Sequence, residues 1–181
     1  MEPEEAQRIM DSVASQPRKL ERIVQHLRML FALKKAQADP QPSMLLDHLY
    51  IGSIGAAMHK ATLKALGITH ILIVAEKLPA LFPTDFTYKT LNLLDTPEAD
   101  LLGILPEALA FITEAQAANG KVLVHCFAGI SRSSSVCAAY LMKTQGMRLA
   151  QAVEYMRSRR GVVQPNAGFL AQLQSYEERT S

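Results

Sequence analysis

The chain has 181 residues, of which 49% are hydrophobic and 20% are charged, a composition typical of a soluble globular domain. The formal net charge of +2 gives no reason to expect nucleic-acid binding, and no apolar run reaches the roughly 20 residues that a membrane-spanning helix needs. Two cysteines are too few for a disulfide framework, and the acidic start Met1–Glu5 is unlike a signal peptide. We therefore expect one domain of about 140 residues with an N-terminal extension, in the cytosol or the nucleus.

The extension is predicted to contain a basic amphipathic helix. Over residues 18–35, apolar residues recur at helical spacing among arginines and lysines. The run Asp39–Pro42 breaks the pattern and is typical of a linker, so we place the extension at residues 1–42 and the main domain at residues 43–181. The helix can pack on the main domain or dock a partner. Its apolar anchors have the spacing and basic surroundings of calmodulin targets; they are Leu20, Val24, Leu27 and Leu33.

Beyond residue 42, short apolar runs alternate with helical patterns. Strands are expected at 49–51, 68–74, 86–94 and 122–124, and helices up to residue 66 and over 101–118, 133–145, 149–159 and 167–178. This alternation predicts a three-layer α/β domain in which helices flank both faces of a central, mostly parallel sheet. Arg148 stands where a Ser or Thr N-cap commonly starts a helix, so the helix after it lacks its usual start signal.

The segment Val122–Ser135 predicts a strand, a loop of small residues and a helix, in that order. Such a loop can turn several backbone N–H groups inward, and the helix adds the positive end of its dipole, so the loop favours an anion. Cys126 opens the loop, where these N–H groups and the Arg132 guanidinium stabilise a thiolate relative to a thiol. Arg132 can also offer two parallel donors to two phosphate oxygens, and Gly129 lets the backbone fold closely under the anion.

The residues His-Cys-Phe-Ala-Gly-Ile-Ser-Arg-Ser at 125–133 resemble the signature of the cysteine-dependent phosphatases. The residues between the fixed positions of this signature are similar to those of the dual-specificity protein phosphatases. The resemblance covers about residues 44–178 and includes Leu49–Ser53 and Pro165–Phe169. It is strongest to the small plant members, which also carry a basic N-terminal helix, and this implies a link to calmodulin. The resemblance further implies the cysteine-phosphatase fold and the hydrolysis of phosphotyrosine and of phosphoserine or phosphothreonine in proteins.

The expected reaction consists of two displacements through a cysteinyl phosphate, with no metal and no cofactor. Cys126 attacks phosphorus, and water then cleaves the intermediate. His125 is expected to orient the loop through a hydrogen bond, Ser133 to contact the thiolate or cap the helix, and Asn166 to brace the loop from behind. The residues expected to hold the phosphate are Phe127, Ala128, Gly129, Ile130, Ser131 and Arg132.

Asp95 is the predicted general acid, which protonates the leaving group and then activates water. It is the first carboxylate after a predicted strand, and it precedes Cys126 by 126 − 95 = 31 positions, a spacing similar to that of the family. Glu98 and Asp100 are better explained as acidic residues that stabilise the N-terminus of the next helix.

Three other functions fit these residues less well. A phosphoinositide or another highly anionic ester would favour lysines inside the loop, whose variable positions are apolar or small. A non-catalytic binding module would have lost Cys126, Arg132 or the acid, and a sulfur-transfer enzyme would not explain Arg132 together with His125. We therefore expect a phosphoprotein substrate, with a MAP kinase as the family-level expectation. The helix over 18–35 can dock that kinase, bind calmodulin or pack on the main domain, and neither a nucleic acid nor a membrane is an expected partner.

Overall fold

The computed structural model describes residue 34 and residues 39–180, and its contacts separate residues 1–35 from residues 36–181 as two units. The amphipathic helix predicted over 18–35 therefore lies, apart from Lys34, outside the described residues. Over the described residues, no helix has both the length and the apolar character needed to cross a membrane.

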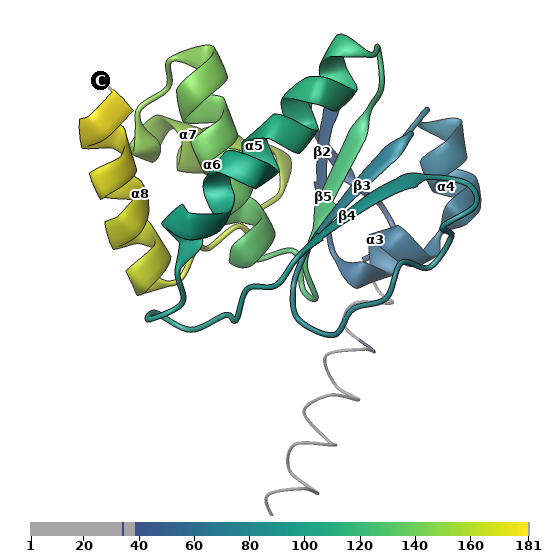
Figure 1. Cartoon of the computed structure of the whole chain (residues 1–181), viewed down its shortest axis with the longest axis horizontal. Coiled ribbons are helices and arrows are strands. Elements are labelled where there is room, and N and C mark those ends of the chain that lie inside the picture. Colours follow the sequence, from purple (N-terminus) through teal and green to yellow (C-terminus); the bar gives the residue numbers. More distant parts are fainter. Residues whose placement is uncertain (1–33, 35–38, 181) are drawn as a thin grey trace, which may run out of the picture. The chain divides into compact units, whose positions relative to one another are not determined.

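A five-stranded sheet forms the centre of the second unit, with the strand order β1-β2-β5-β3-β4 (Figure 1). Strands β2, β5, β3 and β4 run parallel to one another, and β1 pairs with β2 in the antiparallel direction. The mostly parallel sheet predicted from the alternating pattern is thus confirmed. The strands are β1 (Ser43–Leu46), β2 (Leu49–Gly52), β3 (His70–Val74), β4 (Thr87–Leu91) and β5 (Val122–His125).

Helices cover both faces of this sheet, as predicted. Helices α3 and α4 lie against one face and α5, α6, α7 and α8 lie on the other (Figure 1). Their bounds are α3 (Ile54–Met58), α4 (Lys60–Ala65), α5 (Leu101–Ala117), α6 (Arg132–Gln145), α7 (Leu149–Arg159) and α8 (Ala167–Thr180).

The alternation of side chains along each strand divides the core into two parts. In β5, Val122 and Val124 face the larger core, which α5 to α8 cover, whereas Leu123 faces the smaller core beneath α3 and α4. In β3, Leu72 and Ile73 face opposite cores in the same way. All three of the β5 residues are fully buried, which explains why this strand appears in the sequence as an uninterrupted apolar run.

Four local features differ from the sequence-based expectation. Strand β1 and the five-residue helix α3 carry too few residues for a periodic pattern and were not predicted. Strand β4 ends at Leu91 and not near Leu94, because the chain leaves the edge of the sheet there to run toward α5. Helix α6 begins at Arg132, one residue earlier than expected.

Helix α7 begins at Leu149 although Arg148 provides no side-chain cap. The free N–H groups at this end of the helix are bound by two other side chains. Gln151 Oε1 accepts from Arg148 N at 2.9 Å, and Glu177 Oε1, from α8, accepts from Leu149 N at 2.8 Å. An acceptor from another helix thus replaces the missing Ser or Thr, which a local pattern cannot reveal.

Candidate active site

The candidate site lies at the carboxyl end of β5, in the middle of the sheet. His125, the last residue of β5, is paired with Gly52 of β2 on one side and with Ile73 of β3 on the other. Cys126 follows immediately, and the loop over residues 126–131 leads into α6 at Arg132. The structure therefore has the strand, loop and helix predicted from the sequence. The loop lies at the carboxyl ends of the strands, where open α/β folds bind ligands.

Residues 126–131 form the phosphate loop. Each backbone carbonyl of this loop accepts a hydrogen bond from a residue outside it. His125 Nδ1 donates to Cys126 O at 3.1 Å, Ile54 N donates to Phe127 O at 3.0 Å and Gln164 N donates to Ile130 O at 2.9 Å. The remaining donors to these carbonyls are Arg160 for Ala128 and Gly129, Ser134 for Ile130, and Ser134 and Ser135 for Ser131. Because the carbonyls are turned outward, the loop amides are left for an anion on the inner side.

Cys126 is buried at the base of this loop, with an exposed fraction of 1%. Its Sγ accepts a hydrogen bond from Gly129 N at 3.2 Å, and Ser133 Oγ lies 3.3 Å from the same sulfur. Ser133 thus stands in the first turn of α6, and the N-cap position belongs to Ser131. Gly129 N and the Ser133 hydroxyl are thus two polar groups in direct contact with the sulfur.

His125 is fully buried beside Cys126 and points its Nδ1 at the Cys126 carbonyl. Burial lowers the pKa of this imidazole to about 4, and the hydrogen bond to Cys126 O opposes that shift only in part. The ring is therefore neutral near pH 7, and its N–H is used to hold the loop carbonyl in place.

Arg132 reaches from the start of α6 toward the segment that follows β4. Its Nη1 donates to Leu93 O at 3.4 Å, and its Nε lies 3.4 Å from Asp95 Oδ2. This second contact lacks hydrogen-bond geometry, so Nε is a buried donor without a hydrogen-bond partner among the described residues. A buried donor that lacks a hydrogen-bond partner and lies beside the loop can bind an oxyanion.

Asp95 lies between β4 and α5 and is in direct contact with the phosphate loop. Its Oδ1 accepts from Ser131 Oγ at 2.6 Å and from Asn166 Nδ2 at 3.0 Å. Asp100 instead caps α5, where its Oδ1 accepts from Gly103 N at 2.9 Å, and Glu98 is exposed. Of the three carboxylates considered from the sequence, the structure brings Asp95 to the loop.

Asn166 contacts both the loop and Asp95. Its backbone N donates to Ser131 Oγ at 3.1 Å, its Nδ2 donates to Asp95, and its Oδ1 accepts from Phe169 N at 2.9 Å in the first turn of α8. The side chain behind the loop is Arg160, which the sequence interpretation missed. The run Arg157–Arg160 contains three arginines, and no local signal shows which of them is buried.

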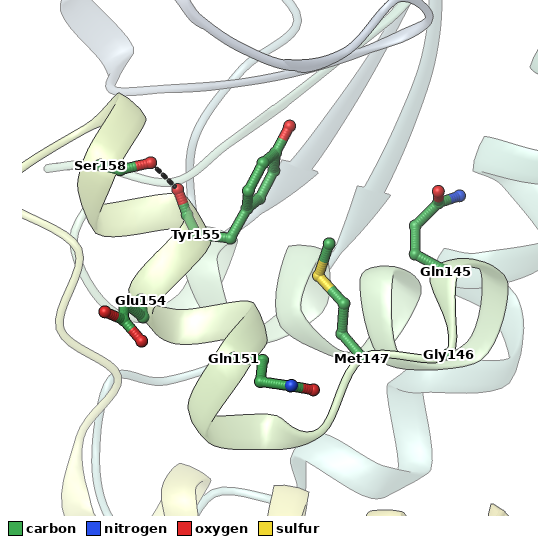
Figure 2. Close-up of a pocket in the computed structure, with 7 residues that line it drawn as sticks. All are labelled: Gln145, Gly146, Met147, Gln151, Glu154, Tyr155 and Ser158. Carbon is green, nitrogen blue, oxygen red and sulfur yellow. Dashed lines mark hydrogen bonds between the residues drawn. The ribbon is translucent and has the colours of Figure 1, made fainter.

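The other loop side chains complete the rim of the site. Phe127, Ala128 and Ile130 are each partly exposed, so the expected phosphate-holding residues lie together around Cys126. Within residue 34 and residues 39–180, no three His, Cys, Asp or Glu side chains are grouped so as to hold a metal ion. A separate hollow of about 560 Å³ lies between the end of α6 and α7, and none of the candidate site residues lines it (Figure 2).

Comparison with known proteins agrees with this geometry. Residues 49–179 match the family model described as dual specificity phosphatase, catalytic domain. The chain belongs to the dual-specificity protein phosphatases. It is 43% identical over 152 residues to dual specificity protein phosphatase 1 of Arabidopsis thaliana, covering 84% of this chain and 77% of that protein. It is also 46% identical over 136 residues to dual specificity protein phosphatase 1B of the same plant, covering 75% and 81% of the two chains.

The fold of this phosphatase is shared with a human tyrosine phosphatase-like serine/threonine/tyrosine-interacting protein. The TM-score is 0.73 and the identity is 37%, over 76% of this chain and 96% of the human one. The family and the fold predicted from the signature at 125–133 are thereby confirmed, and the chain is a hydrolase that acts on phosphorylated proteins.

Proposed function

We propose that Cys126 is the nucleophile of this phosphatase and that the phosphate loop with Arg132 binds the transferring phosphoryl group. The thiolate attacks phosphorus, the P–O bond to the substrate breaks, and a cysteinyl phosphate forms. The loop amides and the Arg132 guanidinium stabilise the negative charge on the three equatorial oxygens. The proposal is carried by one observation: Sγ accepts from Gly129 N in a loop whose carbonyls are all bound on the outer side.

Asp95 is the proposed general acid, which gives its proton to the leaving alkoxide or phenolate. Its Oδ1 already accepts two hydrogen bonds, from Ser131 and Asn166, so Oδ2 is the oxygen that carries the proton. In the second step the Asp95 carboxylate takes a proton from water as the water attacks phosphorus and the S–P bond breaks. The Ser133 hydroxyl, 3.3 Å from Sγ, then donates to the departing thiolate.

The test of these roles is the loss of turnover in Cys126→Ser and Arg132→Ala, measured with an aryl phosphate. Each change should lower kcat to below about one per cent, because losses at such groups run to two or three decades. Cys137→Ser is the matched control, since Cys137 is the other buried cysteine and belongs to the larger core. Residual activity above one per cent in either site variant, with the control unchanged, would contradict the covalent mechanism.

We propose a MAP kinase, phosphorylated on threonine and tyrosine, as the substrate. The resemblance to the dual-specificity phosphatases and the basic residues of 18–35 support this substrate, because kinases are bound at acidic surfaces by basic segments. Cys126→Ser in the full chain should retain the phosphorylated kinase more strongly than the unphosphorylated kinase, which only the basic segment can hold, and tungstate should remove that difference. Equal retention of both forms would exclude the kinase as a substrate.

The same segment is the proposed calmodulin site. Its apolar anchors and basic residues, given above, have the pattern of an amphipathic target helix, which calmodulin binds only with calcium. Calorimetry of the full chain with calmodulin should show heat in calcium and none in a calcium chelator. Replacing Leu20 and Leu33 by Asp should abolish that heat without changing the hydrolysis of an aryl phosphate. An absence of calcium-dependent heat in the unmodified chain would exclude calmodulin and leave kinase docking or packing on the main domain.

A further inference from the structure

Arg160, which follows α7, is a buried arginine, and all three nitrogens of its guanidinium group make polar contacts. Its exposed fraction is 7%. Nε donates to Gly129 O at 3.0 Å and Nη2 lies 3.4 Å from Ala128 O, so one side of the fork holds two neighbouring carbonyls of the phosphate loop. The other side pairs with Asp39, through Nη1 to Oδ1 at 3.1 Å and through a closer contact of Nη2 with Oδ2.

The contact with Arg160 sits at the most constrained point of the loop. Gly129 has φ +66°, in the left-handed region, and a Cβ there would lie 2.6 Å from Arg160 Nη2 and 2.6 Å from Gly52 O. The loop backbone therefore packs directly against the guanidinium group. Gly129 is also the residue whose N–H donates to Cys126 Sγ, so Arg160 holds the carbonyl of the residue whose amide faces the nucleophile.

Arg160 also differs in charge from the other donors to the loop carbonyls. Those donors are backbone N–H groups, serine hydroxyls and the neutral His125 ring, whereas Arg160 is a cation. A buried cation needs a partner, and Asp39 supplies it. Burial tends to raise the pKa of Asp39, but its hydrogen bonds and charge interaction with Arg160 outweigh that effect and leave the pKa below its usual value.

Asp39 is itself fixed to the domain near the loop. Its backbone carbonyl accepts from Ser53 Oγ at 3.3 Å, and Ser53 caps α3, whose first residue, Ile54, donates to Phe127 O. The residue that neutralises Arg160 thus belongs to the unit 36–181, although it precedes the first strand.

We propose that Arg160 is a positioning residue for the phosphate loop, and that Asp39 holds the Arg160 side chain in the orientation in which it donates to the Ala128 and Gly129 carbonyls. The proposal rests on the proposed role of the loop as the phosphoryl site. Without Arg160, two adjacent carbonyls lose their donor and are free to turn inward, where they repel an anion and displace the Gly129 amide. A pair that only stabilises the fold would leave anion binding unchanged in any variant that still folds.

The experiment measures the binding of inorganic tungstate to full-chain variants by calorimetry, which does not require turnover. Arg160→Met, which keeps the length of the side chain, should bind tungstate at least about ten-fold more weakly and lose a comparable factor in kcat/KM, as displacement of a binding group does. Tyr155→Phe is the matched control: Tyr155 lies on α7, which directly precedes Arg160, and its hydroxyl donates to Leu45 O of β1 and not to the phosphate loop. The control should lower the thermal midpoint while keeping tungstate affinity within about two-fold.

Two further variants test the roles of Arg160 and Asp39 separately. Arg160→Lys keeps the charge but cannot reach two carbonyls and Asp39 together, so it should weaken tungstate binding by at least about three-fold, and it replaces Arg160→Met if that variant does not fold. Asp39→Asn should also weaken binding, because Arg160 loses its fixed orientation. Tungstate affinity equal to that of the unmodified chain in folded Arg160→Met or Arg160→Lys overturns the proposal, and equal or tighter binding in Asp39→Asn overturns the role of Asp39. If tungstate fails to bind the unmodified chain, the proposed function of the loop fails instead.

Discussion

The Ser131 hydroxyl donates to Asp95 Oδ1 across 2.6 Å and so joins the phosphate loop to the segment that follows β4. The proposed acid is therefore attached to the same loop that holds the phosphoryl group. Asn166, from the start of the last helical segment, binds the same carboxylate oxygen at 3.0 Å. Three segments of the chain meet at this oxygen, and the other carboxylate oxygen, Oδ2, lies 3.4 Å from Arg132 Nε.

Asp95→Asn should lower kcat for an alkyl or phenyl phosphate by about two decades and have a smaller effect on an activated aryl phosphate, whose leaving group needs little protonation. The alkaline limb of the kcat pH profile should also flatten, because that limb reports the loss of the acid's proton. Glu98→Gln and Asp100→Asn serve as controls and should retain both the rate and the limb. If one of the two controls shows this combined loss and Asp95→Asn does not, the acid has been assigned to the wrong residue.

Ser131→Ala should lower kcat by about ten-fold for the poor leaving group only, since it removes one of two donors that orient the acid. The double variant with Asp95→Asn distinguishes orientation of the acid from a separate effect on the loop. If Ser131 acts through Asp95, the double variant should be no slower than Asp95→Asn alone, whereas independent effects would multiply. Steady-state kinetics of the four proteins with both substrates provides this cycle.

Gly168→Ala should displace the segment that carries Asp95. An added Cβ at this position in α8 would lie 1.9 Å from the Pro97 carbonyl oxygen, so the backbone at Pro97 must move. We expect a loss of about 1–3 kcal/mol in the free energy of unfolding, as for other overpacked sites, together with slower turnover of poor leaving groups. Gly161→Ala is the matched control, because a Cβ there meets nothing within 4 Å. Equal denaturant midpoints for the two variants would contradict the close packing.

The features predicted correctly from the sequence are those that depend on residues close together in the chain. The alternation of strands and helices and the loop after β5 each depend on a local pattern, so the order of elements and the position of Cys126 follow from it. Asp95 could be chosen because it directly follows a predicted strand that ends on the same side of a parallel sheet. The basic helix and its partners stay predictions, since they fall on residues 1–33 and 35–38, outside the described part of the chain.

The features that were missed depend on residues far apart in the chain. Asp39 and Arg160 are separated by 121 positions, and neither carries a local signal of its partner or of its burial. The Glu177 acceptor for the start of α7 is 28 positions from Leu149. Such contacts are set by how helices pack on the sheet, which a periodic pattern leaves undetermined.

Iodoacetate should alkylate Cys126 and leave Cys137 unmodified. Iodoacetate is an anion that the phosphate loop attracts, and the Cys126 sulfur lies at the base of that loop, where Gly129 N donates to it. Burial raises the pKa of the Cys137 thiol far above its usual value, and the nearby charge of Cys126 adds to this shift. Peptide mass mapping should find one carboxymethyl group, on Cys126, and phosphate should protect it. Labelling of Cys137 in the folded chain would contradict its burial in the larger core.

The neutral, buried His125 ring should make the stability of the protein depend on pH in a defined window. Its folded pKa is about 4, below the usual value of 6.5, so the unfolded chain takes up a proton first as the pH falls. The stabilising contribution of the neutral ring is therefore complete above about pH 6.5 and is lost progressively between pH 6.5 and 4, to a total of about 3 kcal/mol. His125→Gln keeps a donor that can reach the Cys126 carbonyl but does not titrate, so its free energy of unfolding should fall less between pH 7 and pH 4 than that of the unmodified chain. Urea titrations of both proteins at several pH values measure this difference, and because the other groups titrate alike in the two proteins, parallel curves would mean that His125 is not buried in its neutral form.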